Sequence, residues 1–271
     1  MNRSIVTLLA FLLLASASTA QRQHDIFSSP LTKTIASVVA QTRVITVDAL
    51  EIQNVVQEKA PRISFTVPMP HEPNLTLTLD RMTVVAPGSR LTVMTNDGPQ
   101  HSILGTNAVW YRTTLPENGF AVFTFGADGS VTGMIDGKMG RFVIGHKATS
   151  SDPQEYIVAR EKIQQFSCGT PTEMLSSELD KLIAESHRAV AKVSEDAQAG
   201  DTIIMEIAVE ADYQLRRKLG TLELATTYVT QLLAILSTIY ERELAVKFVI
   251  TNVRIWDTSN DPYTDNKGIF A

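Results

Sequence analysis

The stretch Thr202-Ile-Ile-Met-Glu-Ile-Ala-Val-Glu-Ala-Asp212 has a regular alternating pattern, and two further segments of regular pattern follow it. Every second residue in its middle is apolar, at Met205, Ile207, Val209 and Ala211. Successive side chains of a strand point to opposite faces of a sheet. This alternation therefore predicts a β-strand with one apolar face.

The next segment, residues 219–242, carries apolar side chains at every third or fourth position, which predicts an amphipathic helix of about five turns. Its stripe consists of Leu222, Ala225, Val229, Leu232, Leu236 and Tyr240, widened by Leu233 and Ile239. The third segment, Val246–Trp256, has apolar residues on both faces, as in a strand covered on both sides. The order strand, helix, strand predicts two parallel strands joined by a right-handed crossover.

Upstream, residues 40–160 hold short β-branched or alternating runs separated by turn residues. We predict strands at 43–48, 62–67, 75–79, 82–85, 91–95, 107–113, 120–125, 130–135, 140–144 and 156–159, with a helix at 49–59 capped by Asp48. Turns are expected at Pro87-Gly88, Asn96–Pro99, Asp128-Gly129 and Asp136-Gly137. Evenly spaced strands with turns between them indicate an antiparallel sandwich or a barrel-like sheet.

Residues 1–20 have the pattern of a secretory signal peptide. Arg3 precedes the apolar run Ile5–Leu14, and a small-x-small signal predicts cleavage between Ala20 and Gln21. We expect no later window to be apolar enough to cross a membrane. We therefore expect a secreted or periplasmic protein without a membrane partner after cleavage. The net charge of −5 also argues against a nucleic-acid partner, which needs a concentrated basic patch.

Residues 161–200 are expected to form a helical connector, with a helix from Glu173 to about Glu195, and they contain Cys168. Because Cys168 is the one cysteine of the chain, no intramolecular disulfide can form. A single cysteine in an exported protein indicates an intermolecular bridge or a thiol with a function. The alternative is that Cys168 is simply a small residue in a connector.

The sequence contains no motif that assigns catalytic residues. His-Glu-x-x-His is absent, and His71-Glu72 is followed by Pro73, which predicts a turn. No phosphate-binding loop and no Gly-x-Ser-x-Gly elbow occurs either. Asp261, after the last strand, is interpreted as a loop anchor. We therefore predict no catalytic residue and no complete metal site in these 271 residues.

The segment Ile204–Tyr213, with the helix and strand after it, resembles the start of the catalytic domain of adamalysin-type (reprolysin-like) metzincin zinc proteases. Tyr240–Leu244 and Val253–Trp256 with Asp261-Pro-Tyr are similar to bacterial secreted members, and Gly129–Ile135 is similar to their all-β pro-region. The resemblance implies an α+β protein: an antiparallel β-rich pro-domain at 21–160, then an incomplete α/β (βαβ) half-domain of metzincin type at 201–271.

The same resemblance places Cys168-Gly169-Thr170 where relatives carry a cysteine switch, so Cys168 would be a zinc ligand that keeps water from the metal. The zinc motif His-Glu-x-x-His-x-x-Gly-x-x-His lies further along in the family. These residues are therefore expected to be the N-terminal portion of a zinc metalloendopeptidase, not proteolytic alone and without a bound cofactor. The alternative is a non-enzymatic secreted module that binds or inhibits a related metalloprotease in trans, with that protease or a protein substrate as partner.

A two-stranded parallel sheet with one helix leaves a strand edge and an apolar face uncovered. We therefore expect the unit at 201–271 either to be marginally stable and prone to aggregate, or to pack on the β-rich domain.

Overall fold

The structure is a computed structural model that describes residues 22–29, 42–105, 107–147, 150–161 and 202–263. In these ranges the chain is a mixed α+β protein, mostly strands with three helices. The helices are α1 (Ala49–Glu58), α3 (Tyr213–Leu219) and α4 (Leu222–Leu244). The strands are β1 (Gln23–His24), β2 (Phe27–Ser28), β3 (Thr42–Val47), β4 (Arg62–Val67), β5 (Leu75–Met82), β6 (Val85–Thr95), β7 (Gly98–Ile103), β8 (Ala108–Leu115), β9 (Gly119–Gly126), β10 (Val131–Gly137), β11 (Gly140–His146), β12 (Glu155–Arg160), β13 (Ile203–Ala211) and β14 (Val246–Trp256).

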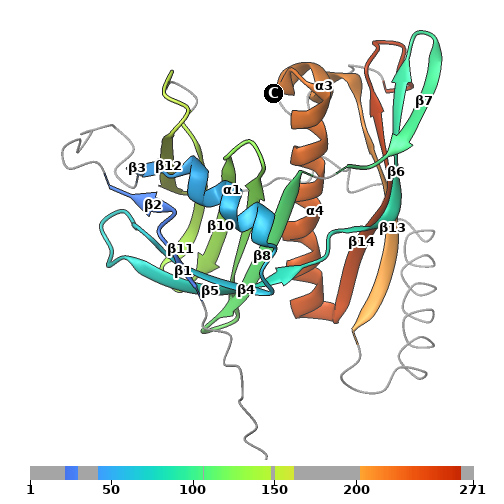
Figure 1. Cartoon of the computed structure of the whole chain (residues 1–271). Coiled ribbons are helices and arrows are strands. Elements are labelled where there is room, and N and C mark those ends of the chain that lie inside the picture. Colours follow the sequence, from blue (N-terminus) through green and yellow to red (C-terminus); the bar gives the residue numbers. More distant parts are fainter. Residues whose placement is uncertain (1–21, 30–41, 106, 148–149, 162–201, 264–271) are drawn as a thin grey trace, which may run out of the picture.

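The larger sheet has ten strands in the order β1-β4-β5-β8-β9-β10-β11-β12-β3-β2, and it is curled (Figure 1). Every neighbouring pair is antiparallel except β1 with β4. The segment Gln23–Ser28 pairs with β4 through β1 and with β3 through β2, so it bridges the two ends of the sheet. The arrangement matches the barrel-like alternative of the sequence. Residues 22–29, for which the sequence predicts no strand, are therefore part of this sheet.

Aromatic rings fill the inside of the curled sheet. Phe65 packs edge-on against Phe123 and Phe125, with centroid distances of 5.0 and 5.8 Å, and Phe27 closes the cluster from β2. Tyr111 lies beside them, and its hydroxyl donates to the carbonyl of Ala60 at 2.8 Å. Burial raises the pKa of Tyr111 to about 12. The ring therefore stays neutral in the core, where a charge would be costly.

Helix α1 covers this aromatic core, and its start is as predicted. Asp48 accepts hydrogen bonds from the backbone amides of Leu50 and Glu51, at 3.0 and 3.1 Å, and so caps the helix. The helix buries Ile52, Val55 and Val56. Helix α1 and the sheet therefore share one core.

Gly133 in β10 is the point of closest packing in this core. It lies opposite Phe123 of β9, and a Cβ at this position would come within 2.5 Å of the Phe123 ring. We expect Gly133→Ala to lower the free energy of unfolding by about 1–3 kcal/mol, because the ring is held by Phe65 and Phe125 and cannot move aside freely. Denaturant unfolding measures the change. Gly145→Ala in β11 is the control, since nothing lies within 4 Å of its added Cβ; equal losses for the two variants would contradict the prediction.

The smaller sheet contains the strand–helix–strand unit. Its order is β13-β14-β6-β7, with β13, β14 and β6 mutually parallel and β7 antiparallel to β6. The predicted strands at 202–212 and 246–256 and their parallel pairing are confirmed. The hairpin β6–β7 comes from inside the range 21–160 yet pairs with a strand of the range 201–271.

Several details near this hairpin differ from the sequence prediction. The separate strands expected at 82–85 and 91–95 are wrong, because β5 runs to Met82 and β6 is one strand whose register against β14 shifts around Pro87-Gly88. Strand β7 was not predicted. Elsewhere, Asp136-Gly137 ends β10, and the turn falls on Lys138-Met139 instead.

Helix α4 lies between the two sheets, and α1 lies on the opposite side of the larger one (Figure 1). One apolar cluster joins Trp110, Phe120 and Val122 of the larger sheet to Val229 of α4 and Ile250 of the smaller. The unit at 201–271 therefore packs on the β-rich part, which is the second of the two expected outcomes. Strand β9 is buried along its whole length, because α1 covers one face and α4 the other.

Packing on two sides changes which residues of α4 are buried. Leu232 and Tyr240, predicted to face the core, are 43% and 40% exposed, whereas Ser237 and Thr238 are buried. The Thr238 hydroxyl donates to the carbonyl of Ala234, and Ser237 accepts from the amide of Phe248, so neither polar group is left unpaired.

The predicted helix at 219–242 begins later than expected. Leu219 ends the short helix α3, Gly220 has a φ of 85°, and Thr221 caps α4 by accepting from the amide of Leu224. Helix α4 is long and apolar enough to cross a membrane by length and composition, which corrects the expectation that no later segment is. Within the fold, 39% of its apolar window is buried. A helix packed between two sheets needs the same apolar composition.

Candidate functional site

A cleft of about 700 Å³ lies between the larger sheet and the N-terminal half of α4. Its walls come from β8, β10, β11, β12 and the turn after β9 on one side, and from the first turns of α4 on the other. The volume lies in the range of small-molecule and peptide sites, about 300–1,000 Å³. Its position follows from the shape of the curled sheet, which α4 meets along one part of its outer face.

Aromatic side chains form the floor and one rim of this cleft. Trp110 and Tyr156 are buried, and His146 stacks perpendicular to Tyr156 with ring centroids 5.5 Å apart. Tyr228 of α4 also lines the cleft and is 44% exposed. Rings of this kind supply a large contact area for a ligand while keeping few rotatable bonds.

The indole of Trp110 has an unused donor. Trp110 is only 6% exposed, and its Nε1 is buried without a hydrogen-bond partner in the described structure. Buried indole N–H groups usually find an acceptor, and one left unpaired costs about 1–3 kcal/mol.

The ionisable side chains that line the cleft in the described part of the chain are Asp128, His146, Tyr156, Glu223 and Tyr228. Asp128 and Glu223 carry the carboxylates, and no lysine or arginine is among the described residues that line the cleft. Asp128 is held by Ser130, whose amide and hydroxyl both donate to its Oδ1. Burial raises the pKa of Tyr156, a backbone hydrogen bond with Val131 lowers it, and the Asp128 charge raises it again, with a net increase. Tyr156 therefore stays neutral.

A second, smaller pocket of about 370 Å³ lies at the other end of α4, and its arginines are already paired. Arg112 binds both carboxylate oxygens of Glu241, at 2.6 and 2.5 Å. Arg242 donates to the carbonyl of Asn118 at 2.6 Å and lies 5.1 Å from the Phe120 ring centroid. These contacts fasten the C-terminal end of α4 to the larger sheet, so we interpret the pocket as structural.

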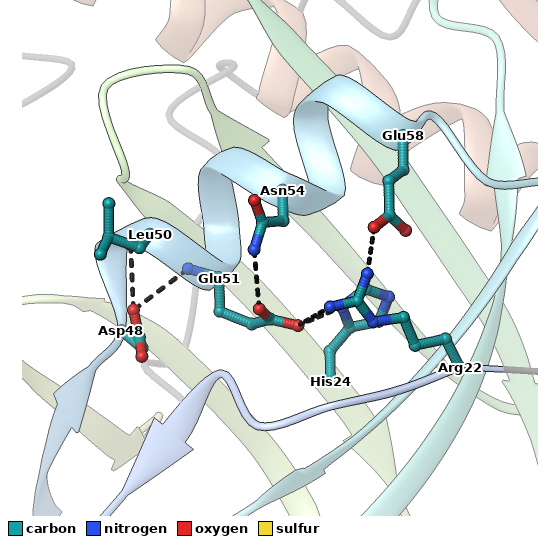
Figure 2. Close-up of polar contacts among 7 residues, drawn as sticks. All are labelled: Arg22, His24, Asp48, Leu50, Glu51, Asn54 and Glu58. Atoms are coloured by element: carbon teal, nitrogen blue, oxygen red, sulfur yellow. Dashed lines mark hydrogen bonds and ion pairs between the residues drawn. The ribbon is translucent and has the colours of Figure 1, made fainter.

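A third polar cluster joins the N-terminal segment to α1, as Figure 2 shows. The Nδ1 atom of His24 lies 2.7 Å from Oε1 of Glu51, whose other oxygen accepts from the amide of Asn54 at 3.0 Å. Arg22 pairs with Glu58 and approaches Glu51. His24 is 1% exposed, and its Nε2 is buried without a partner. A carboxylate–imidazole pair can orient a general base, but here the ring is closed off from substrate, so the cluster ties β1 to α1.

This cluster predicts a specific pH dependence of stability. Burial acts to raise the pKa of Glu51, but hydrogen bonds from Asn54 and His24 and the charges of His24 and Arg22 together hold it below its ordinary value of 4.5. A lowered pKa means that the ionised carboxylate stabilises the fold above pH 4.5 and that this contribution is lost as the pH falls through the folded-state pKa.

Glu51→Gln is accordingly expected to lower the free energy of unfolding by about 1 kcal/mol at neutral pH, with the difference from the unmodified protein shrinking below pH 4.5. Denaturant unfolding over a pH series down to about 3 measures it. Glu206→Gln, which removes an exposed carboxylate on β13, is the control. A difference that grows on acidification would contradict the prediction.

The sequence-predicted site residues are placed only in part. Cys168, Ala20 and Gln21 lie outside the described residues, as do the expected signal peptide and connector helix. Within the described ranges, no group of three or more His, Cys, Asp or Glu side chains is placed to hold a metal ion. Asp261 anchors its loop, as predicted, by accepting from the amides of Tyr213 and Tyr263 at 2.8 and 3.1 Å.

Neither the cleft nor the His24–Glu51 pair could be predicted from the sequence. The cleft combines residues from Leu91 to Gln231, and each of them fits an ordinary strand or helix position. No protein-family model matches the chain, and comparisons with curated proteins and with solved structures also find no match.

Proposed function

We propose that these residues are the pro-region and the opening part of the catalytic domain of a secreted zinc metalloendopeptidase of the reprolysin-like class. The observation that carries the proposal is the parallel unit β13–α4–β14, whose order is the one that the resemblance at Ile204–Tyr213 implies.

The β-rich part supports the opening unit in the way a pro-region would. Its hairpin β6–β7 adds two strands beside β14, and its larger sheet covers one side of α4. A two-stranded parallel sheet with one helix would otherwise leave its apolar surfaces in water. In this proposal, the pro-region stabilises the start of the catalytic domain by completing its sheet.

The proposed protease chemistry needs a zinc ion that polarises a water molecule. The described residues do not fit such an ion, and the 271 residues contain no His-Glu-x-x-His. The proposal therefore assigns the zinc site to residues other than these and gives these residues no proteolytic activity of their own.

Reading the coding DNA beyond codon 271 in the three forward frames tests the proposal. We expect His-Glu-x-x-His-x-x-Gly-x-x-His in frame or after one shift, and its absence from all frames would contradict the proposal. Zinc analysis and a casein assay of the purified chain give a second test. Stoichiometric zinc together with hydrolysis would overturn the assignment of no activity to these residues.

The second candidate is a non-enzymatic secreted module that binds a related metalloprotease in trans. One observation favours it. In the described part of the chain, β13 is an edge strand, and Ile204 and Met205 on it are 65% and 47% exposed. An edge of this kind can pair with a strand of another protein. Adding the purified chain and its Cys168→Ala variant to a reprolysin-like protease tests it, and no inhibition by either protein would remove this candidate.

A further inference from the structure

We propose that the outer edge of β13, together with the open face of α4 beside it, binds a second copy of this chain in a two-fold symmetric dimer. The proposal does not rest on either proposed function, because it uses only the surface of the described residues. Three features carry it: exposed apolar side chains on both elements, an unprotected strand edge, and the charge pattern along that edge.

Helix α4 carries a row of large apolar side chains that the described part of the chain covers only in part. Residues four positions apart lie on the same face of a helix. Five of the six members of the row are between 40% and 62% exposed. The row consists of Leu224, Tyr228, Leu232, Leu236, Tyr240 and Leu244. A contiguous exposed apolar surface of this kind marks an interaction site.

The row continues onto the edge of the smaller sheet. The ring centroids of Tyr240 and Phe248 are 4.7 Å apart, and Phe248 of β14 is paired with Met205 of β13. Paired residues of neighbouring strands lie on the same face of a sheet. Helix α4 packs mainly on β14, which leaves Met205 47% exposed. Met205 and Tyr240 therefore belong to one apolar surface.

Strand β13 lacks the features that keep an edge strand unpaired. In the described part of the chain it is the outer strand of the smaller sheet (Figure 1). Its nine residues include no proline and no lysine. The extra residue at the register shift, Thr251, belongs to β14, so β13 itself is regular. Proline, lysine and bulges are the usual means of blocking an edge. The edge of β13 can therefore accept another strand.

The charges along β13 favour a second copy as that strand. Full antiparallel pairing of its nine residues with those of a copy places the middle residue, Ile207, on the two-fold axis. Glu206 then faces Ala208 of the second copy, and Glu210 faces Ile204 of the second copy. No carboxylate lies opposite another one. An axis at Ala208 would instead set Glu206 against Glu210, and like charges directly opposite each other destabilise a strand pair.

The same axis turns the open faces of the two α4 helices toward each other. Because α4 lies over β14 in each copy, three strand spacings, about 14 Å, separate the two helices. This distance exceeds the 8–10 Å that is usual for packed helices. The large side chains Leu232, Leu236 and Tyr240, with Met205 beneath them, would fill the difference from both sides. The two four-stranded sheets become one continuous sheet.

Sedimentation velocity on the full chain at increasing concentration measures the dimer. The nine residues of β13 and the exposed row of α4 form an interface smaller than the usual 20–30 residues a side. We therefore expect a weak dimer, with a dissociation constant of about 1–100 µM. A monomer at every concentration up to about 500 µM would overturn the proposal.

Two substitutions at Ala208 test the strand pairing in opposite directions. Ala208 is exposed and faces Glu206 of the second copy in the proposed register. Ala208→Glu should raise the dissociation constant about threefold to tenfold, and Ala208→Lys should lower it by a similar factor, because each dimer contains two such cross-strand pairs. Gln100→Glu and Gln100→Lys are the matched controls, because Gln100 is exposed on β7, the opposite edge strand of the same sheet.

One substitution on α4 tests the helix contact. Leu232→Ser should weaken the dimer at least about threefold, because it removes apolar area that the second copy covers. Ile103→Ser is its control, since Ile103 is 76% exposed on β7, away from the proposed interface.

Unchanged dissociation constants for the controls, with the expected shifts at Ala208 and Leu232, support the proposal. Shifts of the same sign for the two Ala208 variants would overturn it, and so would equal responses at Ala208 and Gln100. An unchanged dissociation constant for Leu232→Ser would show that α4 takes no part in the contact and would overturn the proposed arrangement.

Discussion

Removal of the hairpin β6–β7 is expected to unfold the unit β13–α4–β14 while the ten-stranded sheet stays folded. The excision is clean because β5 and β8 are already neighbours in that sheet, and Met82 is paired directly with Trp110. A short turn of Gly and Asn in place of residues 84–108 would therefore join two strands that lie side by side. The hairpin is an insertion between them that reaches across to the smaller sheet.

The expected loss is large because the hairpin holds β14 through both backbone and side chains. The amides of Ile250 and Asp257 donate to the carbonyls of Val84 and Met94, at 2.8 and 2.9 Å. The Ser89 hydroxyl donates to the Ile250 carbonyl at 2.8 Å. Both residues are buried and lie where the register between β6 and β14 shifts. Without these partners, β14 becomes a second free edge next to apolar residues, which favours self-association.

Hydrogen exchange measures the result. Amides of β13, α4 and β14 should lose protection, those of β9–β12 should keep it, and the variant should elute as larger species in size-exclusion chromatography. Asp97→Ser at the exposed hairpin tip is the control. Undiminished protection of β14 in a monomeric variant would show that α4 alone holds the unit in place.

This hairpin also shows where sequence reasoning reaches its limit. Alternation and helical spacing identified β13, α4 and β14, because those signals are local. Strand β6, which pairs with β14, lies about 160 positions earlier in the chain. No local sequence pattern indicates that these two strands pair. Strand β7 escaped prediction because Gly98-Pro99 reads as a turn. A proline is accepted there because β7 is an edge strand of the described sheet, whose outer amides need no partner.

The candidate cleft escaped prediction for a related reason. From the sequence, Trp110 is predicted to be one more apolar strand residue. The structure, with α4 in place, shows that its indole N–H has no acceptor among the described residues. Helix α4 itself was predicted with one apolar stripe, since a single stripe suits a helix packed on one sheet. Its second contact comes from the ten-stranded sheet. That contact buries Thr230 and Thr238 and leaves Leu232 outside.

The double packing of α4 leads to the second large prediction, that Ile250→Ala lowers the free energy of unfolding by about 2–5 kcal/mol. Ile250 lies in β14 with 0% exposure, in the cluster that joins α4 to both sheets. Val84 and Ser89 hold the backbone at this position, so the surroundings cannot collapse easily around the missing side chain. A cavity that cannot collapse gives the upper part of the range.

Ile204→Ala is the matched control for this test. It removes the same atoms from the neighbouring strand of the same sheet, at a position that is 65% exposed, so its cost should stay within about 0.5 kcal/mol. Guanidinium unfolding followed by circular dichroism measures both variants. If the two substitutions cost the same, β14 is not packed against α4 in solution, and the β-rich part would not be what completes the smaller sheet. A large loss for Ile250→Ala alone would instead tie the stability of the strand–helix–strand unit to the β-rich part that covers it.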